Sequence, residues 1–311
     1  MFFLLISILI LILWIIIGTT YLKFNPFLVL FLGSIFLCFF LEIPLYDIPK
    51  FLLTGFSETI GKIGLLIIFG TIIGATLELT NATSSIANYI ISRFNNIPLQ
   101  FKIGFIGYII SIPVFCDAAF IILSKAIKSI SKKSNVPLKS LGVALSTGLF
   151  APHVLVPPTP GPLAAASNLR LENLPLLIII GGILAFILVI VGSYYSFLIF
   201  RKSKFDYNTL TNIEYDSKNP NLYDSIMPIF IPVILMAMGT LLGNISTLRN
   251  LDFIFSFLGN PSFALFIGVL LSLRLIKLSP EVELKNCIKK GVFSAFPIIL
   301  ITGMGGTLGL I

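Results

Sequence analysis

The sequence predicts an all-α polytopic membrane protein with inverted repeats, broken helices and re-entrant hairpins, in which the second repeat is incomplete. Hydrophobic residues make up 57% of the 311 residues and charged residues 11%, against roughly 45–50% and about 25% in soluble domains. Apolar runs of about 17 residues or more recur along the chain, long enough to cross a hydrocarbon core of ~30 Å. Two of these runs contain prolines that interrupt a helix.

Apolar length defines nine candidate membrane segments. Residues 51–62 are shorter and of mixed character, so we expect them to lie along the membrane interface. Residues 82–93 follow a polar cluster, and we expect them to be the returning arm of a re-entrant hairpin over 63–93. The nine segments are 2–17, 27–41, 63–79, 103–124, 140–168, 174–200, 226–243, 262–276 and 295–311.

The net charge of +8 is spread between the apolar runs and forms no single basic stripe, so nucleic-acid binding is not predicted. The lysine-rich residues 125–139 and the cluster at 201–204 are expected to face the cytoplasm. Segment 140–168 must then cross the membrane despite its prolines. No cationic residue precedes the first apolar run, so residues 2–17 are expected to be a retained helix and not a cleaved signal. The predicted location is the inner (plasma) membrane.

An internal repeat predicts the domain organisation. Asn25-Pro26 recurs as Asn260-Pro261, and the glycine-rich residues 70–74 recur as 305–309, both at an offset of 235 residues. The predicted units are a first transmembrane repeat (1–200), a cytoplasmic linker (201–225) and a partial second repeat (226–311). An odd number of crossings before the linker would invert the second copy, as in many secondary transporters. Because nothing after Ile311 corresponds to residues 82–200, we expect a fragment.

Asp117 lies deep in segment 103–124, one turn after Pro113. An ionised carboxylate at membrane depth is costly, so Asp117 is expected to face a cavity or a partner. It is therefore a candidate for substrate binding and proton coupling. The alternative, which is compatible, is a cap on a broken half-helix.

Residues 152–162 read Pro-His-Val-Leu-Val-Pro-Pro-Thr-Pro-Gly-Pro, through which no helix runs unbroken. A broken span places half-helix N-termini near the midplane, where their dipoles favour a carboxylate. Pro158, Thr159 and Gly161 are therefore candidate substrate-binding residues; the alternative is a loop between two spans. His153, the one histidine of the chain, is a candidate for substrate binding and proton coupling because imidazole titrates near neutrality. A structural role is its alternative.

The polar cluster at residues 80–85 supplies neutral donors at the expected hairpin tip, namely Thr80, Asn81, Thr83, Ser84 and Ser85, of which Asn81, Thr83 and Ser84 are selected. These three residues are candidates for substrate binding. The alternative is an ordinary surface turn with a helix cap.

The sequence contains no set of residues typical of an enzyme active site. The three cysteines have no metal-ligand spacing, one histidine cannot form a two-histidine metal site, and no serine motif has a base partner. A phosphate loop is also missing, so ATP-driven transport is not predicted. We expect no enzyme activity, no cofactor and no metal.

Residues 112–120, Ile-Pro-Val-Phe-Cys-Asp-Ala-Ala-Phe, and the proline-rich residues 152–166 resemble the gluconate permease family of proton symporters, as do 69–74 and 301–306. The resemblance implies an ion-transporter superfamily-like fold of paired hairpins and broken helices in two inverted repeats. Dimers are common in that wider group, which allows a homodimer here. Family members have roughly 450 residues. Compared with them, this chain would lack the C-terminal third. The family often has a second histidine where this chain has Thr159, so no proton role is carried over to that position.

Together these features predict a secondary active transporter that imports gluconate or a related small hydroxylated carboxylate by proton symport. Its partners would be the organic acid, protons and membrane lipid. Half-helix N-termini would hold the carboxylate, and Asp117 or His153 would carry the proton. Two alternatives remain: a cation–proton exchanger of related architecture, and a non-transporting fragment of a broken permease gene.

Overall fold

The computed structural model describes residues 2–93, 96–112, 116–134, 136–157, 159–169, 171, 173–200, 220–242 and 257–311. All regular secondary structure in these residues is helical, which confirms the all-α prediction. The helices are α1 (Phe2–Ile16, followed by a π-helical turn, Ile17–Tyr21), α2 (Pro26–Phe40), α3 (Ile48–Leu79), α4 (Ala82–Arg93), α5 (Leu99–Ile110), α6 (Cys116–Ser134), α7 (Leu138–Leu155), α8 (Pro160–Asn168), α9 (Leu174–Ile199), α10 (Leu222–Leu242), α12 (Pro261–Leu278) and α13 (Leu284–Leu310).

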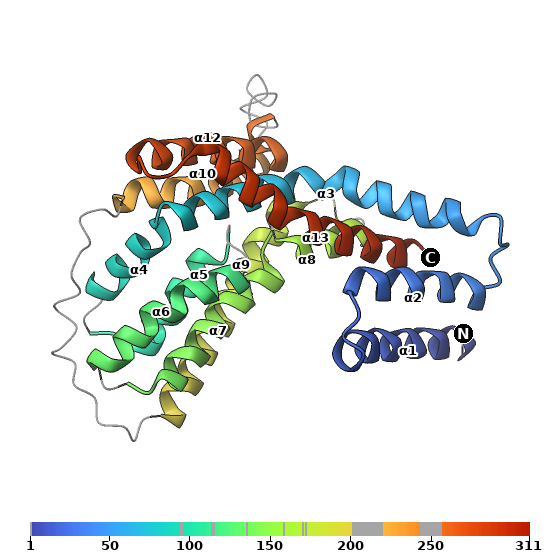
Figure 1. Cartoon of the computed structure of the whole chain (residues 1–311), viewed down its shortest axis with the longest axis horizontal. Helices are drawn as coiled ribbons and strands as arrows, with labels where there is room; N and C mark the ends of the chain where they lie inside the picture. Colours follow the sequence, from blue (N-terminus) through green and yellow to red (C-terminus); the bar gives the residue numbers. More distant parts are fainter. Residues whose placement is uncertain are drawn as a thin grey trace.

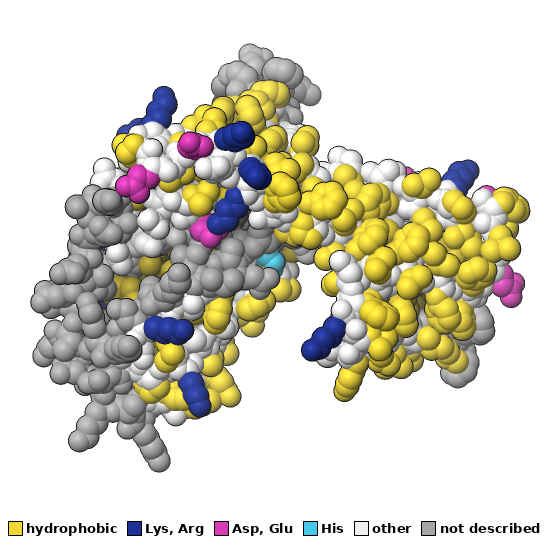
Figure 2. All heavy atoms as spheres, viewed as in Figure 1, with side chains coloured by type: hydrophobic (Ala, Val, Ile, Leu, Met, Phe, Trp, Pro, Cys, Tyr) yellow, Lys and Arg dark blue, Asp and Glu magenta, His cyan; other side chains and the backbone are white. Residues whose placement is uncertain are grey.

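Within the described residues, five helices are long and apolar enough to cross a membrane, namely α3, α7, α9, α12 and α13. The protein is therefore polytopic. Helices α4 to α9 form one lobe, whereas α1 and α2 lie in an arm with parts of α3 and α13 (Figure 1). The long helices α3 and α13 pack side by side and connect the two parts. Hydrophobic side chains cover most of the visible face of the arm, as expected for a surface in lipid (Figure 2).

Helix α3 corrects the prediction for residues 51–62. These residues do not form a separate interfacial segment, because they are continuous with 63–79 in one helix of 32 residues. Thr59 and Ile63 are buried, while Glu58 and Lys62 on another face are exposed. The mixed composition therefore reflects a helix with one face packed on α13 and one face open.

The helices that correspond in the predicted repeat pack reciprocally. Asn25 caps α2 by accepting from the Phe27 amide, and Asn260 caps α12 by accepting from the Ser262 amide. Helix α2 packs on α13, and its counterpart α12 packs on α3. This reciprocal packing is compatible with the predicted repeat, which stays a prediction. The predicted linker 201–225 lies mostly outside the described residues, although its last residues, 222–225, form the start of α10.

Two glycines allow the close packing of α3 against α13. A Cβ atom on Gly55 would lie 2.6 Å from Thr307 Cα, and a Cβ atom on Gly291 would lie 2.7 Å from Ile72 Cα. Both distances are shorter than a non-bonded carbon contact allows. The backbones therefore approach through small residues, as is common between helices in membranes.

We predict that Gly55→Ala destabilises the protein by on the order of 1–3 kcal/mol, because the added methyl group meets backbone and α3 must move away from α13. Gly61→Ala is the matched control, since nothing lies within 4 Å of its added Cβ. The midpoint of thermal unfolding in detergent should fall for Gly55→Ala and stay or rise for Gly61→Ala. Equal midpoints for the two variants would show that the contact carries no such energy.

Segment 103–124, predicted as one span, is divided between two helices. Helix α5 ends at Ile110 and α6 begins at Cys116. The Gln100 amide donates to Ser140 Oγ (3.0 Å) and Ser111 Oγ donates to the Leu149 carbonyl (2.6 Å), so α5 runs parallel to α7. Helix α6 ends at Ser134, close in sequence to the start of α7 at Leu138, and packs on α7, so it runs back toward the start of α5. Apolar length alone did not reveal this reversal.

The reversal also changes the predicted topology. Lys102 near the start of α5 now lies at the same end of the lobe as Lys139 near the start of α7. A single span over 103–124 would have separated these lysines across the membrane. Because the chain reverses between α5 and α6, both lysines lie at one end of the lobe, and the positive-inside rule predicts the cytoplasmic side for both.

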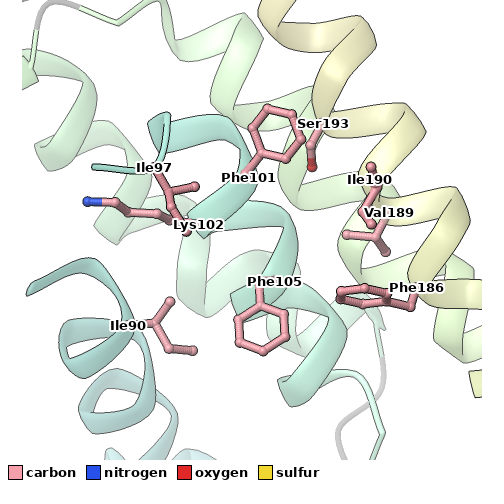
Figure 3. A pocket seen from close by; sticks show the side chains of 9 residues that line it. All are labelled: Ile90, Ile97, Phe101, Lys102, Phe105, Phe186, Val189, Ile190 and Ser193. Carbon is pink, nitrogen blue, oxygen red and sulfur yellow. The ribbon is translucent and has the colours of Figure 1, made fainter. Parts of the chain in front are cut away.

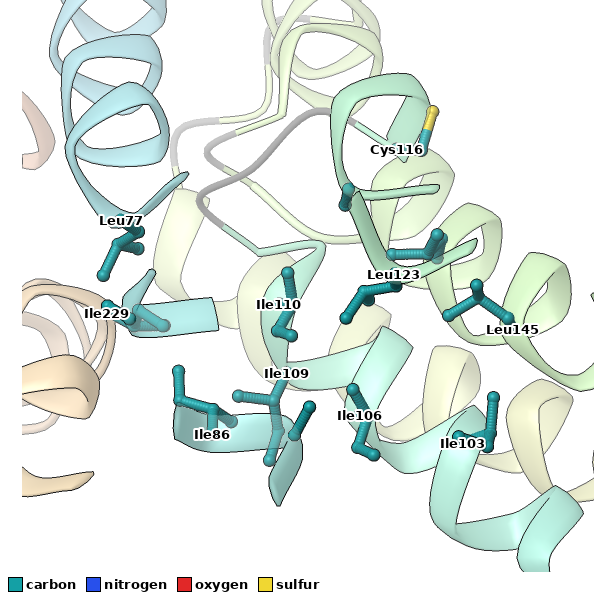
Figure 4. Close-up of a cluster of buried hydrophobic side chains, with 14 of the residues drawn as sticks. Leu77, Ile86, Ile103, Ile106, Ile109, Ile110, Cys116, Leu123, Leu145 and Ile229 are labelled. Carbon is teal, nitrogen blue, oxygen red and sulfur yellow. The ribbon is translucent and has the colours of Figure 1, made fainter. Parts of the chain in front are cut away.

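The core of the lobe runs along its length. Buried residues from α3, α4, α5, α6 and α7 form one cluster, in which Leu77, Ile86, Ile106, Ile110 and Leu145 are at most 1% exposed (Figure 4). Leu77 precedes the end of α3, and Ile110 ends α5. The cluster therefore fixes the positions of the helix ends from which the candidate site is built.

Candidate functional site

Two helices of the lobe, α4 and α5, are too short to cross a membrane. Helices α4 and α5 have 12 residues each, which corresponds to about 18 Å and to little more than half of a hydrocarbon core. The end of α4 at Arg93 and the start of α5 at Leu99 are close in sequence, and the positive-inside rule predicts that both lie on the cytoplasmic side. The start of α4 and the end of α5 are therefore expected to lie inside the membrane, where unpaired backbone groups need polar partners.

The turn between α3 and α4 carries the first group of predicted residues. Asn81 is exposed and has a φ of 56°, a left-handed conformation that asparagine tolerates. Its carbonyl accepts from the Ser84 and Ser85 amides (3.1 and 3.2 Å) and so begins α4. Helix α4 then packs more extensively on α5 and α10 than on α3, so the arms of the predicted hairpin 63–93 diverge.

Two hydroxyl groups at the start of α4 are buried without a partner. Thr83 is 1% exposed, and neither Thr83 Oγ1 nor Ser85 Oγ has a hydrogen-bond partner among the described residues. A buried polar group left unpaired costs about 1–3 kcal/mol. By contrast, Thr80 Oγ1 donates to the Thr76 carbonyl (2.7 Å). The positions of Thr83 and Ser85 are therefore suited to a polar ligand rather than to helix stability.

The proline-rich residues break their span as predicted. Helix α7 ends at Leu155, Val156 has extended backbone angles, and α8 begins at Pro160. Thr159 is buried and its hydroxyl donates to the Val156 carbonyl (2.6 Å), which closes the turn within the break. Gly161 is exposed, and a Cβ added there would meet nothing within 4 Å. Pro158 lies outside the described residues.

Hydrogen bonds hold the break beside the end of α5. Ser111, the residue after α5, donates to the Leu149 carbonyl one turn before Pro152, and Tyr108 Oη donates to the Gly182 carbonyl of α9 (3.1 Å). Val156 packs in a cluster with Ile178 of α9, with Tyr108 against it. The end of α5 and the interruption of α7 therefore lie at one end of the lobe.

The two proton-coupling candidates come from the same end. Asp117 lies in the first turn of α6, directly after the interruption that follows Ser111, and its side chain is outside the described part of the chain. His153 is half-buried in the last turn of α7. Helix α6 begins a few residues after the end of α5 and α8 a few residues after the end of α7, while α4 packs on α5. The positive end of each helix dipole favours an anion at the start of its helix.

Three polar residues near the candidate site, Ser85, Glu78 and Tyr108, were not among the predicted substrate-binding residues. Ser85 was part of the polar cluster, but only its burial distinguishes it from an ordinary capping residue. Glu78 pairs with Lys290 of α13 across 2.6 Å, one turn before the start of α4. Tyr108 lies in an apolar run, where its hydroxyl gave no signal of the contact with α9. The repeat offset does not align Glu78 with Lys290, so no pattern in the sequence indicated this pair.

Interrupted helices with polar residues at their inner ends, inside a bundle with a lipid-facing surface, are the architecture of a multi-pass membrane permease. The chain belongs to the family described as "GntP family permease", and the family model matches residues 2–311. This is a family of permeases and not of enzymes.

Three relatives illustrate the match. An "Uncharacterized permease" of Haemophilus influenzae is 32% identical over 280 residues, which cover 83% of this chain and 57% of the relative. The "Gnt-II system L-idonate transporter" of Escherichia coli is 30% identical over 226 residues (70% and 51%). The "D-serine transporter DsdX" of Escherichia coli is 27% identical over 299 residues (93% and 66%). The chain thus spans between half and two thirds of the length of these relatives. No solved structure matches it.

Proposed function

We propose that this protein takes part in the import of gluconate or a related small hydroxylated carboxylate by proton symport across the inner membrane. The observation that carries the proposal is the pair of buried, unpartnered hydroxyls of Thr83 and Ser85 at the start of α4. Helix α4 packs on α5, and the bond from Ser111 to the Leu149 carbonyl holds the end of α5 beside α7, which supports one shared site. A hydroxylated carboxylate supplies both the anion that helix N-termini favour and the partners that hydroxyls require.

The substrate class rests on chemistry that two relatives share in their names. L-Idonate and D-serine both carry a carboxylate and a hydroxyl group, and the proteins named for them are similar to this chain. In the proposal, Thr83, Ser84 and Asn81 at the α4 turn, with Thr159, Gly161 and Pro158 at the break, bind the substrate. Asp117 or His153 carries the coupling proton, because both lie at the ends of interrupted helices. The domain division into 1–200, 201–225 and 226–311 and a homodimer remain parts of this proposal.

The test is uptake by the full 311-residue chain in proteoliposomes. With the inside made alkaline relative to the outside, labelled gluconate, L-idonate or D-serine should accumulate against its gradient, and a protonophore should abolish that accumulation. Equilibrium binding of the same compounds to the purified chain is measured in parallel. Binding without uptake would contradict transport by this chain, and accumulation that ignores the protonophore would contradict proton coupling.

A further inference from the structure

A hydrophobic groove lies on the outer side of the lobe, away from the proposed substrate site. Its cavity of about 280 Å3 lies between α4, α5 and α9 and is lined mainly by Phe101 and Phe105 of α5 and by Phe186, Val189 and Ile190 of α9 (Figure 3). Phe186 and Ile190 are 41% and 42% exposed, so the cavity opens toward the surroundings of the protein. In a membrane protein those surroundings are acyl chains.

One end of the groove is cationic. Lys102 is 3% exposed, its stem lines the cavity, and its Nζ donates to the Ile91 carbonyl at 3.1 Å. The helices around the groove, with α7 beside them, contain Arg93, Lys102 and Lys139 and not one aspartate or glutamate. No carboxylate of the described residues pairs with Lys102. A buried cation without a counter-ion is costly, so an external anion would stabilise this end.

The groove lies along the direction of a lipid chain. Ser193 and Lys102 lie at one end and Phe105 and Phe186 at the other. The eight residues from Phe186 to Ser193 span about 10 Å of helix. The cationic end is the end of the lobe that the positive-inside rule assigns to the cytoplasm. Because its walls are hydrocarbon, the groove would leave the hydroxyl groups of a sugar acid unpaired, so it does not suit the transported substrate.

We propose that this groove is a binding site for an anionic phospholipid of the cytoplasmic leaflet. One acyl chain lies between α5 and α9, and the phosphate lies at the end of the lobe where Lys102 is found and where α4 ends with Arg93 and α7 begins beside Lys139. Basic pockets between helices on the cytoplasmic side are suited to such headgroups. Burial of each methylene of the acyl chain against the phenyl rings contributes as well. This site does not depend on the proposed transport activity.

The test uses a tryptophan in the groove and brominated lipids as quenchers. Trp14 is the only tryptophan of the chain, so Phe186→Trp in a Trp14→Phe background gives a single reporter. The full chain is reconstituted in phosphatidylcholine vesicles with an equal fraction of either brominated phosphatidylglycerol or brominated phosphatidylcholine. At equal bromine content, phosphatidylglycerol should quench the reporter at position 186 at least twofold more effectively.

The matched control is Ile187→Trp in the same background. Ile187 is the next residue of α9, at nearly the same depth, is 50% exposed and does not line the cavity. Its reporter should be quenched equally by the two lipids. Equal quenching of the reporter at position 186, or the same preference at position 187, would overturn the proposal.

Charge variants complete the test. Lys102→Met in the Phe186→Trp chain should remove the preference for phosphatidylglycerol, and Lys102→Arg should keep it. Because Lys102 is buried, its replacement can impair folding; the double variant Arg93→Gln and Lys139→Gln changes only exposed side chains and should also lower the preference. A preference that survives both the loss of Lys102 and the double variant would show that no anionic headgroup is recognised here.

Discussion

Thr83→Val is expected to lower the apparent affinity for gluconate by roughly 10- to 100-fold while leaving the protein as stable as before. The hydroxyl of Thr83 is buried and has no partner among the described residues, so its loss removes no hydrogen bond within that part of the chain. If the hydroxyl bonds a charged substrate, its removal costs about 1.5–3 kcal/mol of binding free energy. Uptake kinetics in proteoliposomes and thermal unfolding in detergent measure the two effects separately.

Ser92→Ala is the control for this variant. Ser92 lies in the last turn of the same helix, α4, is exposed, and its hydroxyl donates to the Tyr89 carbonyl. Its replacement should change neither uptake nor stability. If Thr83→Val keeps normal uptake, the hydroxyl does not bind substrate. If Thr83→Val loses uptake and stability together, Thr83 is a structural residue.

Asp117→Asn is expected to reduce proton-driven accumulation to the level of liposomes without protein. Asp117 lies in the first turn of α6, beside the interruption between α5 and α6. A carboxylate inside the membrane can bind and release a proton, whereas an amide cannot. Counterflow exchange of labelled for unlabelled gluconate, which needs no net proton movement, is measured on the same preparations. Retention of exchange with loss of accumulation would assign Asp117 to coupling.

Glu283→Gln is the matched control because Glu283 is an exposed acid directly before α13. It should accumulate gluconate as the unaltered chain does. Normal proton-driven accumulation by Asp117→Asn would refute the role of Asp117 and leave His153 as the remaining candidate for the coupling proton.

The interruptions of helices were predictable from the sequence, but their directions were not. The prolines at 157–162 remove helix hydrogen bonds, so the break after Leu155 follows from residue chemistry alone. The same reasoning located a disturbance near Pro113. It could not show that α6 turns back along α7, because apolar length is the same for a crossing and for two half-helices. That reversal became visible only through the contacts of Gln100 and Ser111 with α7.

Helix packing, which the sequence does not reveal, explains the other differences between the predictions and the structure. Glu58 and Lys62 made residues 51–62 appear interfacial, yet the buried face with Thr59 and Ile63 joins them to α3. The caps at Asn25 and Asn260 were readable because capping is local. The unpartnered state of Thr83 and Ser85 was not readable, because it depends on which helices cover the start of α4.

We propose that the unpartnered hydroxyls at the start of α4 face a polar pocket inside the membrane that an organic anion can occupy. The most direct test is cysteine labelling in a background without Cys38, Cys116 and Cys287, the three native cysteines. A small charged methanethiosulfonate reagent should modify Thr83→Cys, and gluconate, L-idonate or D-serine should slow that modification. Ala87→Cys, buried one turn further along α4 in the hydrophobic cluster, should stay unmodified. If Thr83→Cys reacts no faster than Ala87→Cys, or at a rate that none of these compounds changes, the pocket does not exist as described.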